Sequence, residues 1–219
     1  MEDYNPQFQY FLELSRNRAI EALDDPHMVK TVTEWGTELV DKMAFFISPE
    51  NVDPYSVMCH GDCWINNTLF RFEEEEPVDV VLLDWQITRH CSPLTDVAYL
   101  FFSGTDYELR KNHFKELLDY YHGCLAKSLS YMGCDIEEHF PKSVFEDHQK
   151  KILPYGLFMS FMLLPAVLGE VEDVPDMDAL LAKEEILQSD LKFENKQASN
   201  RYQIRMRGVV QTCLDMDLI

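Results

Sequence analysis

Basic residues are scarce in this sequence. It holds 19 Lys and Arg residues against 39 Asp and Glu residues, which gives its 219 residues a formal charge of −20. Proteins that bind nucleic acid through its phosphates need an excess of Lys and Arg to displace counterions. We therefore expect no nucleic-acid partner. An anionic small molecule is expected only where a divalent cation or a local basic pocket offsets the negative field.

Closely spaced cysteine pairs are also lacking. The six cysteines form no CxxC motif, and a chain of this length does not need a disulfide framework to fold. The first residues, MEDYNPQFQYFLEL, contain neither the basic nor the apolar region of a secretory signal peptide. These absences predict a cytoplasmic location.

Long apolar runs are limited to one segment, Ile152 to Gly169. Its 18 residues carry no charge, which is borderline for a membrane span. Pro154, Gly156 and Pro165 interrupt the run, and charged sequence flanks it on both sides. We expect a buried core helix here and no membrane association.

The remaining pattern predicts an α+β fold that is mainly helical. With 46% hydrophobic residues, the chain can bury one sizeable core. Apolar residues recur at helical spacing from Gln7 to Leu23 and from Val29 to Ile47, with a break at Asp24 to Pro26. Short strands are expected at the end of VDPYSVMCH and in TLFRF and VDVVLLD, with EEEEPVD as a solvated hairpin tip.

After Pro93 the pattern is helical to the end of the chain. The expected helices are the segment DVAYLFF, Asp106 to Gly133 with Gly133 as its C-cap, a helix capped by Ser143 with Glu146 three residues on, Met177 to Ser189, and Ala198 to Leu214. The predicted architecture is a helical unit with a small β element inserted after the second helix.

One polar motif, HGDCWINN, occupies His60 to Asn67. The strand VVLLD then delivers Asp84, 22 positions after Asp62, and the intervening hairpin can bring both carboxylates to one cleft. Phosphoryl transfer needs a carboxylate to orient the attacking hydroxyl and oxygen ligands to hold Mg²⁺ on the phosphates. Asp62, Asn67 and Asp84 supply that set, although Asp and Asn also favour turns and strand ends without any catalytic role.

A second chemistry is open for the same stretch. Cys59, His60 and Cys63, with His90 and Cys91 downstream, offer thiolate and imidazole ligands of the kind that zinc prefers. Their spacing matches no standard zinc motif, and such cysteines are more often small buried hydrophobic residues. A zinc-stabilised structural protein remains an alternative.

The pattern HxDxxxxN, followed by a hydrophobic strand that ends in Asp, resembles the catalytic half of kinase-like phosphotransferases, the superfamily of aminoglycoside phosphotransferases and choline kinases. The longer sequence segments, HGDCWINNTLF with LLDWQ and SPLTDVAYLFF, are most similar to the ecdysteroid kinase-like, or CHK kinase-like, family. The resemblance implies the C-terminal lobe of a protein-kinase-like fold, in which a small β-hairpin element carries the catalytic loop.

The resemblance also implies a role for each residue of the motif. Asp62 would be the catalytic base, and Asn67 and Asp84 would bind Mg²⁺ together with the phosphates of ATP. His60 would be a structural member of the loop, and Asp96 would brace the loop from the following helix. The implied reaction transfers the γ-phosphoryl group of ATP to the hydroxyl of a small-molecule alcohol, an ecdysteroid or a xenobiotic.

The sequence departs from the family pattern in the part that clamps ATP. Its eight glycines never form G-x-G, and no Gly-rich loop precedes a strand lysine. We therefore expect residues 1–219 to be the C-terminal catalytic and substrate-binding lobe without the N-terminal ATP-clamping lobe, and to have little kinase activity alone. The alternative is a pseudokinase or a binding module for an apolar small ligand. The aromatic residues of DYYHGC and YGLFMSFMLL would either pack the core or line such a pocket.

Overall fold

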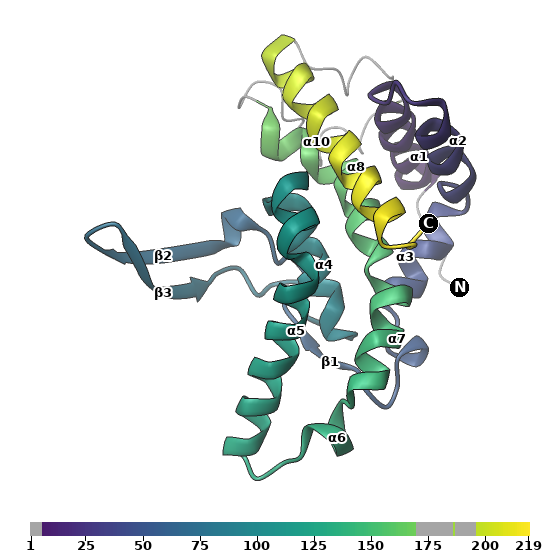
Figure 1. The fold of residues 1–219 in the computed structure, drawn as a ribbon. Coiled ribbons are helices and arrows are strands. Elements are labelled where there is room, and N and C mark those ends of the chain that lie inside the picture. The colour runs from purple at the N-terminus through teal and green to yellow at the C-terminus, as the bar shows by residue number, and fades with distance from the viewer. Residues whose placement is uncertain (1–5, 170–185, 187–195) are drawn as a thin grey trace. The chain divides into compact units, whose positions relative to one another are not determined.

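The computed structural model describes residues 6–169, 186 and 196–219, and Figure 1 shows their fold. Helices make up most of these residues, and the described strands form two small antiparallel sheets. The predicted fold class, a mainly helical α+β protein, is thus confirmed. The chain divides into two compact units, with boundaries between Ala44 and Phe45 and between Gly156 and Leu157.

The first unit is helical. Its described elements are α1 (Pro6–Glu21), α2 (Pro26–Trp35), the first part of α3 (Leu39–Ile47), the larger part of α8 (Pro154–Leu168) and α10 (Lys196–Asp215). Helix α2 contacts both α1 and α10. The ring of Trp35 on α2 meets that of Phe161 on α8, with 6.2 Å between their centroids. The core of this unit therefore joins early and late segments of the sequence.

The second predicted helix is wrong in one respect, because it is two helices, α2 and α3. Gly36 lies in the break, where an added Cβ would be only 2.5 Å from Cδ of Arg16. The Arg16 guanidinium donates from Nη1 to the Gly36 carbonyl at 2.8 Å. Glu38 then adopts a left-handed backbone, with φ of 53°. This contact from α1 ends α2 in the middle of a continuous apolar pattern.

The predicted C-terminal helix, Ala198 to Leu214, is confirmed as α10. Arg201 at its start donates from Nη2 to the Leu168 carbonyl at 2.9 Å, and Arg207 pairs with Asp24 at 2.6 Å. The other helix predicted in this region, residues 177–189, lies outside the described residues apart from Ile186, which is buried.

The second unit contains the described strands. β1 (Val57–Cys59) pairs antiparallel with β4 (Arg89–Cys91), and β2 (Thr68–Glu73) pairs antiparallel with β3 (Glu76–Leu82). The three predicted strands correspond to β1, β2 and β3, whereas β4 was not predicted. The expected single β element is thus two separate sheets, which the segment between β1 and β2 connects.

Four α-helices lie wholly within the second unit: α4 (Pro93–Gly104), α5 (Tyr107–Tyr131), α6 (Ile136–His139) and α7 (Lys142–Ile152). Gly133 ends α5 as predicted, because its φ of 77° suits glycine. Its N–H donates to the Ser130 carbonyl at 3.1 Å, and the N–H of Cys134 donates to the Leu129 carbonyl at 3.0 Å. These two bonds form a Schellman motif.

The predicted Ser143 cap is wrong. Helix α7 begins one residue earlier, at Lys142, with Pro141 at the N-cap position and no capping side chain. The Pro141 carbonyl already accepts the first helical hydrogen bond, from the N–H of Phe145 at 3.0 Å. Ser143 therefore lies within the first turn, where its side chain cannot act as the cap.

The long apolar run forms α8 as expected. Its residues Tyr155, Leu157, Phe158, Phe161 and Leu164 are each at most 3% exposed. In the part of the chain that the structure describes, no single helix has the length and apolarity to cross a membrane, and only α7 and α8 taken together, as a bent pair, meet those criteria.

The β2–β3 hairpin extends away from α4 and α5 (Figure 1). Its side chains Leu69, Phe72, Val80 and Val81 are each more than half exposed. Within the described residues, β2 and β3 pair only with each other. The hairpin therefore presents apolar side chains and strand edges that pair with no other strand of the described residues, and its turn is acidic.

Aromatic side chains fill the core of the second unit. Phe102 and Phe145 are fully buried, and the ring of Phe102 meets that of Phe114 edge-on at 5.7 Å. Gly156 packs directly against Phe102, since an added Cβ would lie 2.3 Å from the ring. Such a distance is far below van der Waals contact, so this position has no space for even one methyl group.

We expect Gly156→Ala to lower the free energy of unfolding by about 1–3 kcal/mol, because the methyl group must displace the buried Phe102 ring. Gly123→Ala is the matched control, since Gly123 lies in α5 with nothing within 4 Å of its added Cβ. The control should raise the free energy of unfolding by about 0.5–1 kcal/mol through the better helix propensity of Ala. Urea unfolding of both variants measures the difference, and equal effects would contradict the packing at Gly156.

Candidate active site

The segment from His60 to Asn67, here called the 60–67 loop, connects the two sheets. It leaves β1 at Cys59 and ends in a short 3-10 turn, η2 (Ile65–Asn67), directly before β2. Two backbone bonds shape it: the N–H of Trp64 donates to the Asp62 carbonyl at 3.1 Å, and the N–H of Asn67 donates to the Trp64 carbonyl at 3.0 Å. The HxDxxxxN spacing therefore corresponds to one compact turn.

Asp96 holds the start of this loop. Its Oδ2 accepts a hydrogen bond from the N–H of His60 at 2.6 Å, and its Oδ1 accepts one from the N–H of Gly61 at 2.9 Å. Asp96 lies in the first turn of α4, whose N-terminus is capped by the Ser92 hydroxyl. A carboxylate is favourable in a first turn, because it faces the positive end of the helix dipole.

Gly61 is required by the backbone of the loop. Its φ is 85°, in the left-handed region, and an added Cβ would lie 2.3 Å from the Ile87 carbonyl oxygen. Both conditions exclude a side chain. The glycine thus allows two consecutive N–H groups to reach the same carboxylate of Asp96.

His60 links the loop to the chain before Asp84. It is 2% exposed, its Nε2 lies 2.7 Å from the Leu83 carbonyl oxygen, and its Nδ1 accepts from the N–H of Asp62 at 3.3 Å. Because Nδ1 is an acceptor, the neutral ring carries its proton on Nε2 and donates it to Leu83. The ring also packs on that of Trp85, with 4.6 Å between centroids. Both ring nitrogens are therefore engaged within the protein.

Asp62 is half-buried and its carboxylate is fixed at both oxygens. Oδ2 accepts from the Asn67 side chain at 2.8 Å, and Oδ1 accepts from the Tyr99 hydroxyl at 2.6 Å. The same Asn67 amide group also donates to the Asp62 carbonyl at 3.0 Å. The structure thus brings Asp62 and Asn67 together, and it orients the carboxylate by two donors.

Tyr99 was missed by the sequence analysis. Its side chain is 3% exposed, and burial together with the hydrogen bond to Asp62 raises its pKa far above the ordinary value. The phenol therefore remains a proton donor to Asp62 at neutral pH. The available signal was the spacing to Asp96, because residues three apart lie on one face of a helix and Asp96 was already expected to point at the loop.

Asp84 lies two residues after the end of β3. Register pairs Thr68 with Leu82, and the N–H of Leu83 donates to the Asn67 carbonyl at 2.8 Å, so the hairpin returns the chain beside Asn67. Asp84 is exposed, with φ of 62°, and among the described residues its carboxylate has no hydrogen-bond or ion-pair partner. No hydrogen bond joins it to the side chains of Asp62 and Asn67.

The side chains of Asn67 and Asp84 carry oxygen atoms of the kind that Mg²⁺ prefers. The Asn67 amide nitrogen donates its hydrogen bonds to Asp62, so Oδ1 is the Asn67 atom that could bind a cation. The Asp84 carboxylate has no partner among the described residues. The part of the chain that the structure describes contains no group of three or more His, Cys, Asp or Glu that could hold a metal. Mg²⁺ needs none, because it commonly takes one or two protein oxygen ligands and completes its shell with water and substrate phosphates.

The cysteines of the zinc alternative are buried thiols. Cys59 donates from Sγ to the Ser92 carbonyl at 3.2 Å, and burial raises the pKa of the Cys63 thiol to about 11. A zinc site that used Cys59, Cys63 and His60 would need thiolates and a free imidazole nitrogen. His60 offers no such nitrogen, since Leu83 and Asp62 occupy both.

The sequence matches the model of the ecdysteroid kinase-like family over residues 1–134. The matched region is more than half of the chain and contains the 60–67 loop, Asp84 and Asp96. The protein therefore belongs to the ecdysteroid kinase-like family. Neither the search of curated proteins nor that of solved structures gave a match.

We expect Asp96→Asn to lower the free energy of unfolding by about 1.5–3 kcal/mol, because hydrogen bonds to a charged group are lost and the new NH₂ faces a backbone N–H. Asp106→Asn is the matched control. Asp106 caps α5 by accepting from the N–H of Leu109 at 2.9 Å, and Asn caps equally well. The control substitution should lower the free energy of unfolding by no more than a few tenths of a kcal/mol.

Urea unfolding gives the two free energies, and hydrogen exchange at the His60 and Gly61 amides locates the effect. Exchange at these two amides should accelerate in Asp96→Asn and stay unchanged in Asp106→Asn. If both variants lost the same stability, with the loop amides still protected, Asp96 would not be the brace of the 60–67 loop.

Proposed function

We propose that this protein is a kinase-like small-molecule phosphotransferase that transfers the γ-phosphoryl group of ATP to an alcohol. Membership of the ecdysteroid kinase-like family supports a kinase-like activity on a small molecule. The observation that carries the proposal is the fixed carboxylate of Asp62, which Asn67 and Tyr99 hold at 2.8 Å and 2.6 Å in a half-buried turn. A carboxylate held in this way suits the orientation of an attacking hydroxyl.

Asp62 would act as the catalytic base. Its carboxylate would accept a hydrogen bond from the acceptor hydroxyl and take its proton as the oxygen attacks the γ-phosphorus, while ADP leaves. Two donors already fix the carboxylate, so little rotamer freedom remains to be lost when the acceptor binds. Tyr99 would position Asp62 and would not itself contact the reacting atoms.

Asn67 and Asp84 would hold Mg²⁺ through the Asn67 Oδ1 and the Asp84 carboxylate. Bound Mg²⁺ supplies neutralisation of the charge on the nucleotide phosphates. This neutralisation matters here more than usual, because the chain carries a charge of −20 and would otherwise repel ATP.

The name of the family suggests an ecdysteroid as acceptor, and we propose a hydroxylated apolar molecule of this kind. An uncharged acceptor is compatible with the acidic surface. The second candidate is a binding module in which no phosphate moves. It is favoured by one observation, the lack of any G-x-G loop in these 219 residues to cover the phosphates, which would cost several kcal/mol of transition-state stabilisation.

Calorimetry with ATP tests the metal half of the proposal without requiring turnover. We expect ATP to bind only when Mg²⁺ is present, and Asp84→Asn to weaken that binding at least tenfold by removing a charged ligand. Asp79→Asn is the control, since Asp79 is an exposed carboxylate on the adjacent strand β3, outside the site. ATP binding that ignores Mg²⁺, or that falls equally in both variants, would refute the metal assignment.

Release of ADP in the presence of candidate alcohols tests the chemistry. We expect Asp62→Asn to lower the acceptor-dependent rate by about 10²–10⁴-fold, the usual contribution of a positioned general base. Its Mg²⁺–ATP affinity should change little, which separates the base from the metal ligands. Full rate in Asp62→Asn would exclude the proposed role. Mg²⁺–ATP binding without transfer to any acceptor would favour the binding module.

A further inference from the structure

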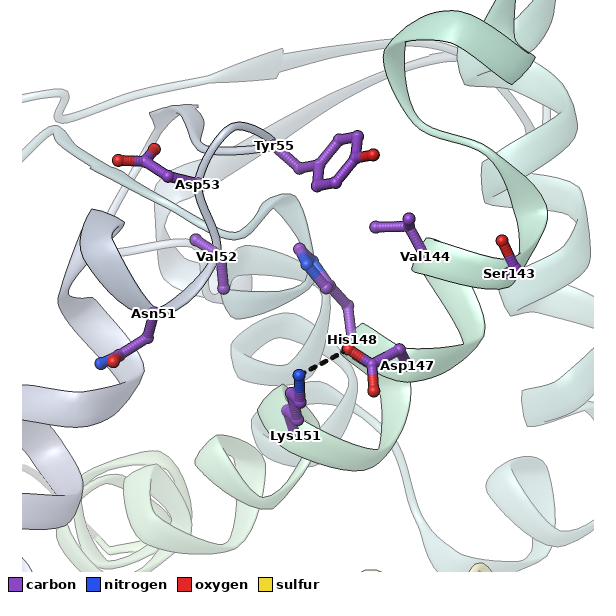
Figure 2. Close-up of a pocket in the computed structure, with 9 residues that line it drawn as sticks. All are labelled: Asn51, Val52, Asp53, Tyr55, Ser143, Val144, Asp147, His148 and Lys151. Carbon is purple, nitrogen blue, oxygen red and sulfur yellow. Dashed lines mark ion pairs between the residues drawn. The ribbon is translucent and has the colours of Figure 1, made fainter.

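A pocket of about 330 Å³ lies in the second unit, between the segment that precedes β1 and helix α7. Figure 2 shows the residues that line it: Asn51, Val52, Asp53, Tyr55, Ser143, Val144, Asp147, His148 and Lys151. None of them is a residue of the 60–67 loop or a proposed Mg²⁺ ligand. The volume lies in the range of small-molecule sites.

The two buried residues that line the pocket are one apolar side chain and one imidazole. Val52 is 4% exposed and His148 is 3% exposed, while Tyr55 and Val144 are half-buried. The Tyr55 ring stands edge-on to the His148 ring, with 6.2 Å between centroids. In Figure 2 the His148 side chain lies in the middle of these residues. A ligand here would place an apolar body against Val52, Tyr55 and Val144, with polar side chains at the rim and one buried polar group beside it.

That polar group is Nε2 of His148. The other ring nitrogen, Nδ1, lies 3.0 Å from the Ser92 hydroxyl, which also accepts the N–H of Leu94 at 3.2 Å. Among the described residues Nε2 has no hydrogen-bond partner. Burial lowers the pKa of His148, which favours the neutral ring with one donor and one acceptor nitrogen. Nε2 is therefore open for one hydrogen bond from a ligand.

A hydroxyl group suits this nitrogen better than a charged group does. The Ser92 contact permits either tautomer, so Nε2 is either a donor or an acceptor. A hydroxyl can both donate and accept and so satisfies both cases. A carboxylate can only accept and an ammonium can only donate, so each fits one tautomer alone.

The rim of the pocket also disfavours anions. Lys151 pairs with Asp147 at 2.7 Å, which neutralises one carboxylate and occupies the ammonium (Figure 2). The Asp53 carboxylate accepts a hydrogen bond from the Ser56 hydroxyl at 2.6 Å. This neutral partner does not offset its charge, so the rim keeps a net negative charge. The chain as a whole adds to this field with its charge of −20.

We propose that this pocket binds a small uncharged alcohol or phenol, with its apolar body against Val52, Tyr55 and Val144 and its hydroxyl on Nε2 of His148. This site goes beyond the proposed transfer reaction, because it contains none of the residues assigned to that reaction. It is nevertheless linked to them by one hydrogen bond and one helix: His148 hydrogen-bonds Ser92, and Ser92 caps the helix that carries Asp96 and Tyr99.

Three probes of matched size test the proposal: benzyl alcohol, benzylamine and benzoate, which differ in the charge on one ring substituent. Each is titrated into the ¹⁵N-labelled protein while the side-chain nitrogens of His148 are followed by NMR. We expect a saturable shift of Nε2 with benzyl alcohol and at least tenfold weaker binding of benzoate, whereas benzylamine reports whether Nε2 can act as an acceptor. The spectrum also identifies the His148 tautomer.

Val144→Phe should fill the pocket and abolish the saturable shift. Lys150→Phe is the matched control, since Lys150 is exposed on the same helix and does not line the pocket. Ser143→Trp, at an exposed lining position, serves as a second blocking variant should Val144→Phe fail to fold. The proposal is overturned by a shift that stays linear with concentration, by equal binding of benzoate, or by unchanged affinity in a folded blocking variant.

Discussion

The contact between one carboxylate and two consecutive backbone N–H groups is the constraint on which the candidate site depends. Asp96 takes the N–H groups of His60 and Gly61 on its two oxygens, and the left-handed backbone of Gly61 aims both in the same direction. His60 and Gly61 are buried, so without this partner two amide groups would be left unsatisfied. The direction in which Asp62 leaves the loop follows from this contact.

Three polar residues along one side of helix α4, including its N-cap, make the hydrogen bonds that support this region. Ser92, Asp96 and Tyr99 are spaced by four and three positions, which places them on one side of the helix. Ser92 meets His148, Asp96 holds the loop, and Tyr99 orients the carboxylate of Asp62. The rest of α4 is largely buried, so these three residues are carried by an element that packing holds in place.

The sequence predicted those features that depend on local spacing. The three strands, α10 and the C-cap at Gly133 follow from patterns within a few residues. The break at Gly36 could not be read in this way, because it depends on Arg16, which lies 20 positions earlier. Tyr99 resembles an ordinary core aromatic residue, and its spacing to Asp96 is the one local signal, because its partner Asp62 lies 37 positions away.

The exposed β2–β3 hairpin has a consequence for the behaviour of the protein in solution. Strand edges that lack partners can pair with those of another molecule, and apolar side chains strengthen such pairing. Here the acidic turn and the charge of −20 oppose the approach of a second copy. That repulsion acts over a Debye length, about 10 Å at 0.1 M salt and about 3 Å at 1 M. We therefore expect ionic strength to govern the colloidal stability of this protein, with low salt keeping it dispersed and high salt bringing the hairpins of two molecules into contact.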